Sequence, residues 1–162
     1  GQPFSHRNAR PSVSAIWIAH RGNRRGKQPE LENKPSYIVG AIDEGFQVEV
    51  DVWCAAGQLW LGHDHPADKI SPSWFFEHED YLWIHCKNLE AVEYFAQSNV
   101  NWFFHQTDDV ALTSKGFLWC YPGIAVPGGR TVLLDFEREI TAVSFQDVIH
   151  YAICADSFSD LN

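Results

Sequence analysis

The clearest pattern in the chain is an alternation of apolar and polar residues from Phe46 to Trp53. Valines occupy every second position in this segment, and successive side chains of a β-strand point to opposite faces. The pattern therefore predicts a strand whose other face carries three polar side chains, Gln47, Glu49 and Asp51. A strand on the protein surface would show the same alternation, so the pattern leaves open whether this face meets water or a pocket.

Six further apolar runs predict additional strands. They lie at residues 16–20, 81–87, 101–105, 117–121, 131–134 and 151–155, and a short run at 59–61 returns the chain after a turn. Helical patterns occur between these runs, beginning with one that Pro35 opens and Gly45 ends. The others are a short aromatic helix within 66–80 and helices at 89–98, 108–114 and 145–150.

Strands and helices alternate at roughly 33 residues, about the length of one strand–helix unit. Right-handed crossovers between such units predict a parallel sheet, open or closed, with helices outside it. In either form the C-terminal strand ends meet at one edge, where ligands bind. We therefore expect one site to collect the polar residues at these ends: His20, Glu49, Asp51, His85, Lys87, His105 and Asp156.

The composition is that of a single globular domain, which we place at residues 15–162 behind an N-terminal tail at residues 1–14. Apolar residues make up 45% of the chain, which is ample for a core. The net charge of −9 argues against a nucleic-acid-binding surface, because phosphate backbones attract basic faces. No apolar run reaches the roughly 18–20 residues of a transmembrane helix, so no such segment is expected.

The four cysteines contain no CxxC pair, which argues against a zinc finger. Each lies in or just after an apolar, strand-like run, at Cys54, Cys86, Cys120 and Cys154. We predict that all four are buried thiols, which is typical of a reducing compartment such as the cytoplasm.

The segment from Ile18 to Pro66 holds residues suited to metal-assisted chemistry on a phosphate. Glu49 and Asp51 are about 7 Å apart on one strand face and can share Mg²⁺ or Ca²⁺. His20 and His63 form the natural acid–base pair, because imidazole titrates near neutral pH. A cationic loop of a size suited to one phosphate lies between the two histidines: Arg21, Arg24, Arg25 and Lys27.

Four motifs, in this order and spacing, resemble the glycerophosphodiester phosphodiesterase family of the phospholipase C-like phosphodiesterase superfamily. They are HRG at 20–22, EN at 32–33, EVDVW at 49–53 and GHD at 62–64. The resemblance implies that His20 and His63 are catalytic. It implies metal ligands at Glu49 and Asp51, with Glu32 and Asn33 in the loop that lines the metal site. It also implies phosphate contacts for Arg21 and Lys87.

Two features depart from the family pattern. Where the family carries a third carboxylate ligand, this chain has His85, which favours Mn²⁺ or Zn²⁺ more than a carboxylate would. Alternatively, Glu32 or water replaces that ligand. The chain is also shorter than the roughly 250 residues of a full barrel, so we predict a shortened or incomplete TIM-type (β/α) barrel with parallel strands and outer helices. His105 and Trp119 would line its pocket.

The resemblance implies a metal-dependent phosphodiester hydrolase, of a kind found in lipid metabolism, that acts on a small-molecule phosphodiester by hydrolysis or by cyclising transfer. A phosphate-binding module without catalysis is the main alternative, because of His85 and the short chain. A zinc hydrolase that uses His20, His63 and His85 is a third possibility. We expect His65, His78 and His150 to be structural or solvated, and Arg130 to be a solvated loop residue.

Overall fold

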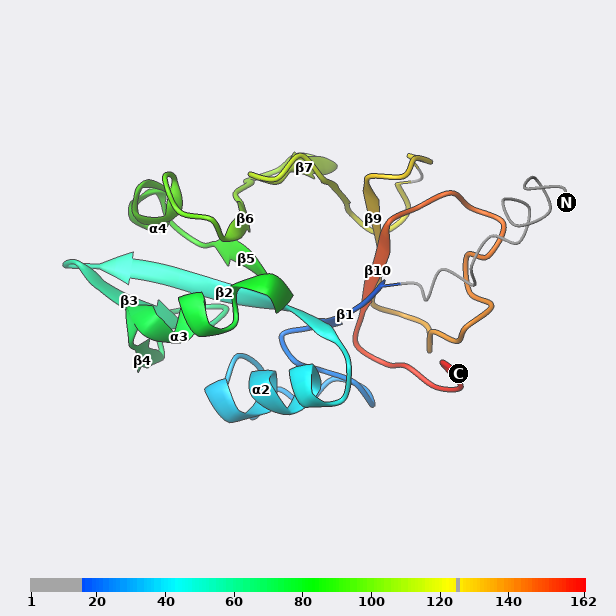
Figure 1. The fold of residues 1–162 in the computed structure, drawn as a ribbon, viewed down its shortest axis with the longest axis horizontal. Helices are drawn as coiled ribbons and strands as arrows, with labels where there is room; N and C mark the ends of the chain where they lie inside the picture. The colour runs from blue at the N-terminus through cyan, green and yellow to red at the C-terminus, as the bar shows by residue number, and fades with distance from the viewer. Residues whose placement is uncertain (1–15, 125) are drawn as a thin grey trace, which may run out of the picture.

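The protein is described by a computed structural model that covers residues 16–124 and 126–162 (Figure 1). The tail predicted at residues 1–14 lies outside these ranges. The described residues form one sheet of ten strands. The strands are β1 (Ile16–His20), β2 (Gln47–Ala55), β3 (Gln58–Leu61), β4 (Asp68–Ile70), β5 (Leu82–Cys86), β6 (Asn101–Phe103), β7 (Val110–Leu112), β8 (Leu118–Cys120), β9 (Thr131–Asp135) and β10 (Ala152–Ala155).

Seven strands form the parallel part of the sheet, which includes both the first and the last strand of the chain. The strands β6, β5, β2, β1, β10, β9 and β8 are ordered so that each described ladder between neighbours is parallel. The first and last strands pair directly, with Trp17 opposite Ile153, so β1 and β10 lie side by side in Figure 1. Three further strands are antiparallel: β3 and β4 extend β2 as a meander, and β7 forms a hairpin with β8.

The sheet curls until its two parallel ends approach one another. No ladder joins β6 to β8 among the described residues. Side chains bridge them instead, since the rings of Phe103 and Trp119 stack with centroids 4.6 Å apart. The backbone of β6 is also tied to the loop before β8, where the Ser114 N–H donates to the Trp102 carbonyl at 2.7 Å. The curl brings the C-terminal ends of β1, β2, β5, β8, β9 and β10 toward one region.

The described part of the chain contains three short α-helices: α2 (Pro35–Asp43), α3 (Pro72–Glu77) and α4 (Leu89–Phe95). Proline begins α2 and α3, where its missing N–H costs no helical hydrogen bond. The Asn88 side chain caps α4 by accepting from the Ala91 N–H. A 3₁₀ turn, η1 (Glu79–Tyr81), leads into β5. None of these described helices has both the length and the apolar character needed to cross a membrane.

The prediction of a TIM-type barrel with outer helices was wrong. Among the described residues, only the connections before β2, β5 and β6 contain an α-helix, and three ladders of the mixed sheet are antiparallel. Residues 108–114, predicted as a helix, contain β7, whose alternating Val110 and Leu112 pair with β8 in a hairpin. Residues 145–150, also predicted as a helix, form turns. Both segments are too short to form stable helices without an apolar stripe docked on the sheet.

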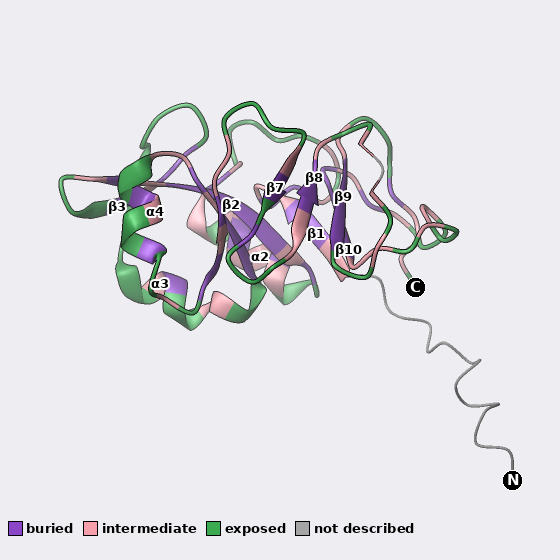
Figure 2. Cartoon of the chain, turned by 90° about the horizontal axis from the view of Figure 1, so that it is seen from above, coloured by how far each residue is buried: buried purple, intermediate pink, exposed green. Residues whose placement is uncertain are grey.

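Apolar residues pack on both faces of the sheet. The larger cluster lies under the helices, where Ile38 of α2, Phe75 of α3 and Phe95 of α4 are fully buried. The second cluster fills the opposite face, inside the curl, and we call this the inner face. Its buried members come from seven strands: Ile18, Trp83, Phe103, Ala111, Trp119, Val132, Leu134, Ala152 and Cys154. In Figure 2, β9 and β10 are drawn largely in purple, the colour of buried residues.

Candidate metal centre and cleft

At the C-terminal ends of six strands, a buried apolar residue of the inner face is followed two positions later by a residue that lines the site. Since side chains alternate along a strand, position i+2 returns to the same face, one step closer to the C-terminal end. The pattern places a polar or aromatic layer above the apolar inner cluster. Its members are His20, His85, His105, Tyr121, Phe136 and Asp156, and Glu49 and Asp51 join them from β2.

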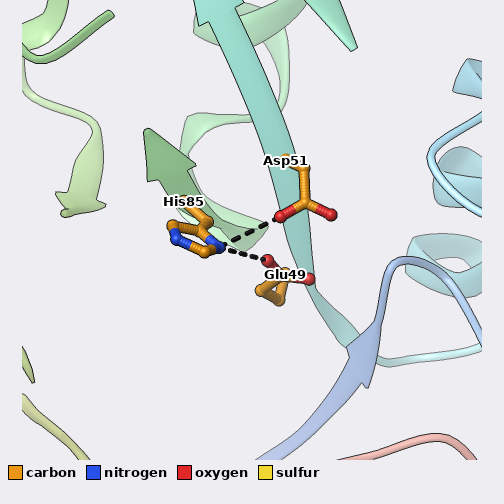
Figure 3. A group of neighbouring side chains, drawn as sticks. All are labelled: Glu49, Asp51 and His85. Carbon is orange, nitrogen blue, oxygen red and sulfur yellow. Dashed lines mark ion pairs between the residues drawn. The ribbon is translucent and has the colours of Figure 1, made fainter. Parts of the chain in front are cut away.

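Glu49, Asp51 and His85 form a group that could hold a metal ion (Figure 3). One donor atom from each lies within 4.8 Å of the others. The Nδ1 atom of His85 is 3.0 Å from an Asp51 oxygen and 3.7 Å from a Glu49 oxygen. The parallel ladder places His85 directly opposite Asp51, which explains their approach. Two carboxylates and an imidazole suit a divalent cation.

The two carboxylates are buried, with 2% of Glu49 and 1% of Asp51 exposed. Burial opposes ionisation of Asp51. The hydrogen bond and charge of His85, the Asn33 hydrogen bond and the Arg21 charge outweigh it, so the pKa of Asp51 falls well below its usual value. Burial likewise opposes protonation of His85, but the Asp51 and Glu49 carboxylates outweigh it and raise the pKa of His85. The site therefore favours positive charge between its carboxylates.

The loop after β1 fixes Asp51 from the other side. Asn33 donates its side-chain N–H to Asp51 Oδ2 at 2.9 Å and accepts the Asp51 backbone N–H at 2.9 Å. The Arg21 Nε lies 3.3 Å from the same carboxylate. Glu32, expected as a metal ligand, is instead paired with Arg21 at 3.0 Å and is not part of the three-residue group.

His20 is held in one orientation beside this group. Its Nδ1 lies 2.8 Å from Asp156 Oδ1, and a carboxylate can only accept, so Nδ1 carries the proton. The ring stacks on Phe136 with centroids 4.1 Å apart. The other ring nitrogen, Nε2, lies 3.9 Å from a Glu49 oxygen. These contacts direct the acceptor nitrogen of His20 to the candidate metal centre.

Asn23, which the sequence did not single out, connects the two halves of the site. It is fully buried, and its Nδ2 donates to Asp156 at 2.8 Å and to Glu32 at 3.1 Å. Its carbonyl oxygen accepts from the Gln28 backbone and from the Tyr37 hydroxyl. Asn23 thereby links the carboxylate that orients His20 to the carboxylate that pairs with Arg21. Its position directly after HRG was the only sequence signal for this role.

His63 lies on a loop at the edge of the site, with 41% of its side chain exposed. Its Nδ1 is 2.8 Å from Asp64 Oδ1. The preceding residue anchors the loop, because the Gly62 N–H donates to the Asp51 carbonyl at 3.1 Å and the Gly62 carbonyl accepts from the Trp53 indole at 2.7 Å. His63 therefore directly follows a residue whose backbone is hydrogen-bonded to β2, the strand that carries Glu49 and Asp51.

A cleft of about 850 Å³ joins these elements. All eleven residues predicted for the site line it: His20, Arg21, Glu32, Asn33, Glu49, Asp51, His63, His85, Lys87, His105 and Trp119. The structure thus brings them together, while their roles stay predictions. Asp156, expected at a strand end, and Lys27 of the cationic loop also line it, and the structure adds Tyr121, Phe136 and His65. Arg130 lies elsewhere, where it donates to the Gly116 and Lys115 carbonyls.

His105 extends the site away from the carboxylates. Its ring stacks on His85 with centroids 4.9 Å apart and meets Tyr121 at 4.4 Å. Burial and the positive charges of His85 and Lys87 lower the pKa of His105 to about 4, so its ring is neutral near pH 7. Burial also raises the pKa of Tyr121, so its hydroxyl keeps its proton. Trp119 lies below them and is 2% exposed.

No protein-family model matches the sequence, and searches of curated proteins and of solved structures give no significant match. The resemblance carried by the four motifs therefore stays a prediction. The fold and the site define the protein as an α/β protein with a mixed sheet and a cleft in which Glu49, Asp51 and His85 could hold a metal ion.

Proposed function

We propose that the protein is a metal-dependent phosphodiesterase that acts on a small phosphodiester in this cleft. The observation that carries the proposal is the position of His20 Nε2, 3.9 Å from a carboxylate of the candidate metal group. A proton-transfer group, a cation site and cationic side chains then face one space. A phosphodiester reaction needs all three, for proton transfer and for the charge on the phosphoryl oxygens.

Glu49, Asp51 and His85 would hold the ion, which when bound supplies Lewis-acid stabilisation of negative charge on the phosphoryl oxygens. Mg²⁺ and Ca²⁺ suit the carboxylates, and the imidazole also accommodates Mn²⁺ or Zn²⁺. Arg21 and Lys87 line the cleft and add positive charge toward the same oxygens. Asn33 and Arg21 hold Asp51 in place through contacts of 2.9 and 3.3 Å.

His20 and His63 would share the proton transfers. Asp156 fixes the tautomer of His20, so its Nε2 can accept a proton or, once protonated, donate one. One histidine takes the proton from the nucleophile, which is water or a neighbouring substrate hydroxyl. The other protonates the leaving alkoxide. His63 is the more exposed of the two, at the mouth of the cleft.

Hydrolysis of an alkyl phosphodiester such as glycerophosphocholine, whose leaving alkoxide needs a proton, tests this proposal with added Mg²⁺ or Ca²⁺. We expect His20→Ala and His63→Ala each to lower kcat by about 10²–10⁴-fold, the usual contribution of a general acid or base, with unchanged circular dichroism. His150→Ala is the matched control, because His150 does not line the cleft and its side chain hydrogen-bonds, among the described residues, only to the Val148 carbonyl. Full activity in either cleft variant would contradict the proposal.

A phosphate-binding module without turnover is the second candidate, and His85 favours it. A protonated His85 between Glu49 and Asp51 can neutralise the carboxylates without an ion. Tight binding of inorganic phosphate without metal-stimulated hydrolysis would support this candidate. A zinc site of His20, His63 and His85 has less support, because the three do not form a ligand group within the described part of the chain.

A further inference from the structure

Beyond the metal centre, the same face of β2 carries a row of large side chains. Side chains alternate along a strand, so Trp53 follows Asp51 on one face of β2, about 7 Å further toward its C-terminal end. Trp53 pairs directly with Trp60 of β3, which in turn pairs with Lys69 of β4. Residues that pair directly across an antiparallel ladder share one face. Two neighbouring indole side chains therefore lie next to the metal centre.

A lysine stands at each end of this row. Lys87 follows β5, and its backbone N–H donates to the Val52 carbonyl at 2.8 Å, so it extends the ladder and lies next to Trp53. Lys69 lies beside Trp60 at the other end. Neither lysine forms an ion pair with any residue that the structure describes. We call Lys87, Trp53, Trp60 and Lys69 the tryptophan platform.

The two indoles of the platform take no part in the core. Both are partly exposed, and neither packs in or against either core cluster of the described residues. Trp53 has a local contact, because its Nε1–H donates to the Gly62 carbonyl at 2.7 Å. Large apolar rings gain most when they leave water, and contiguous apolar surface that stays exposed is typical of a binding site.

The tryptophan platform adjoins the cleft. Lys87 belongs to both, since it lines the cleft and flanks Trp53. Gly62, which accepts from Trp53 Nε1, lines the cleft as well. Trp60 lies one strand further across, at the usual spacing of about 5 Å between strands. A ligand whose phosphate lies at the metal centre would therefore reach the indoles through a short connecting group.

These side chains define the chemistry of the group that fits. Indole faces stack on flat, unsaturated rings, and lysine offers three donors and no acceptor. The platform therefore favours a flat ring whose edge carries acceptors, which describes a nucleobase. A quaternary ammonium group is also attracted to indoles, but it would meet the positive charges of Lys69 and Lys87. An alkyl chain would leave both lysines without a partner.

We propose that the tryptophan platform stacks a nucleobase, so that the substrate is a small phosphodiester with a nucleoside on one side. This inference rests on the proposed function, because the metal centre would hold the phosphoryl group. The pentose of the nucleoside would span the step from the metal centre to the indoles. The net charge of −9 argues against a longer nucleic-acid strand, whose additional phosphates would be repelled.

Binding of two matched ligands tests the platform without requiring turnover. Adenosine 5′-monophosphate and ribose 5-phosphate share a phosphate and a pentose, and only the first carries a base. We expect isothermal titration calorimetry, with Mg²⁺ present, to show about tenfold or greater preference for the nucleotide, which is the usual contribution of one base stacked on an aromatic side chain. Equal affinities, tighter binding of ribose 5-phosphate, or no binding of either would overturn the proposal.

Variants of Trp60 then assign the preference to the platform. Trp60→Leu removes the stacking surface and should reduce the preference about fivefold or more, whereas Trp60→Phe keeps an aromatic ring and should retain most of it. Tyr94→Leu is the matched control, because Tyr94 is an exposed aromatic residue of α4, which packs on the opposite face of β2. Circular dichroism checks that each variant is folded. An undiminished preference in Trp60→Leu would place the base elsewhere and overturn the assignment.

Further results separate this inference from the proposed function and from a polymeric ligand. Preference for the nucleotide without hydrolysis of any phosphodiester would sink the phosphodiesterase proposal and leave the platform standing. Hydrolysis of glycerophosphocholine together with equal affinity for the two ligands would do the reverse. Tighter binding of oligo(dA) than of adenosine 5′-monophosphate would contradict a small substrate.

Discussion

Asp51 shows how single residues make a buried charge tolerable. An isolated carboxylate in this position would take up a proton, because burial disfavours its charged form. Asn33, Arg21 and His85 each supply a donor within 3.3 Å, so the charge is kept. The same arrangement recurs at Asp156, which is 4% exposed and receives donors from His20 and Asn23. Polar partners rather than water therefore hold both carboxylates ionised.

The buried carboxylate of Asp156 is expected to make the stability of the protein depend on pH in acid. Burial raises its pKa, but the hydrogen bond and charge of His20, with Asn23 and Lys27, outweigh burial and lower it below 3.8. The folded state then binds fewer protons than the unfolded chain, so the stabilisation is complete above pH 3.8 and is lost as the pH falls through the folded pKa.

Urea unfolding from pH 6 down to pH 2 measures this effect. The free energy of unfolding should fall less steeply in acid for Asp156→Asn than for the wild-type protein, and the variant should be less stable at pH 6 by about 1 kcal/mol or more. Asp147→Asn, at an exposed position, is the control. If the free energy of unfolding falls with pH equally steeply in Asp156→Asn and in the wild-type protein, folding does not stabilise the charged form of this carboxylate.

At the residue scale, the sequence predicted the candidate site because its residues end apolar runs. Glu49, Asp51 and His85 could be proposed from strand periodicity and motif order. Asn23 and Phe136 could not, since one acts through contacts to residues far along the chain and the other is a common core residue type. Long-range contacts of this kind leave no local pattern in a single sequence.

At the scale of elements, the β3 hairpin and its following loop carry His63 to the cleft. Gly62 makes this loop possible, because its φ of +150° is uncommon for other residues. A Cβ added there would lie 2.1 Å from the His65 carbonyl oxygen, which is backbone and cannot rotate away. The position of His63 therefore depends on a glycine next to it.

Replacing this glycine tests the dependence. Gly62→Ala should destabilise the protein by about 2 kcal/mol or more and lower the proposed phosphodiesterase activity more than a global loss of stability explains. The control is Gly57→Ala, which also has a positive φ of 74° but whose added Cβ meets nothing within 4 Å. Thermal denaturation and initial rates measure both effects. Equal losses of stability and of initial rate in Gly62→Ala and Gly57→Ala would argue against a special role for the loop.

At the scale of the whole molecule, periodicity predicted the parallel strands better than the connections between them. All seven predicted strands overlap parallel strands of the structure, and the first and last pair as adjacent elements. Two of the predicted outer helices are missing, because residues 108–114 contain β7, which forms a hairpin with β8, and residues 145–150 lie in a segment of turns and irregular backbone. Among the described residues no ladder joins β6 to β8, and the stacked rings of Phe103 and Trp119 lie between these two strands instead.

The central claim is that Glu49, Asp51 and His85 bind the ion on which phosphodiester hydrolysis depends. Initial rates of bis(p-nitrophenyl) phosphate hydrolysis by metal-stripped protein, measured against increasing Mg²⁺, Ca²⁺, Mn²⁺ or Zn²⁺, test it most directly. The account predicts no rate without metal, a saturable rise with at least one ion, and a midpoint about tenfold or more higher in Asp51→Asn. An undiminished rate in excess chelator, or no rate with any ion in folded protein, would contradict it.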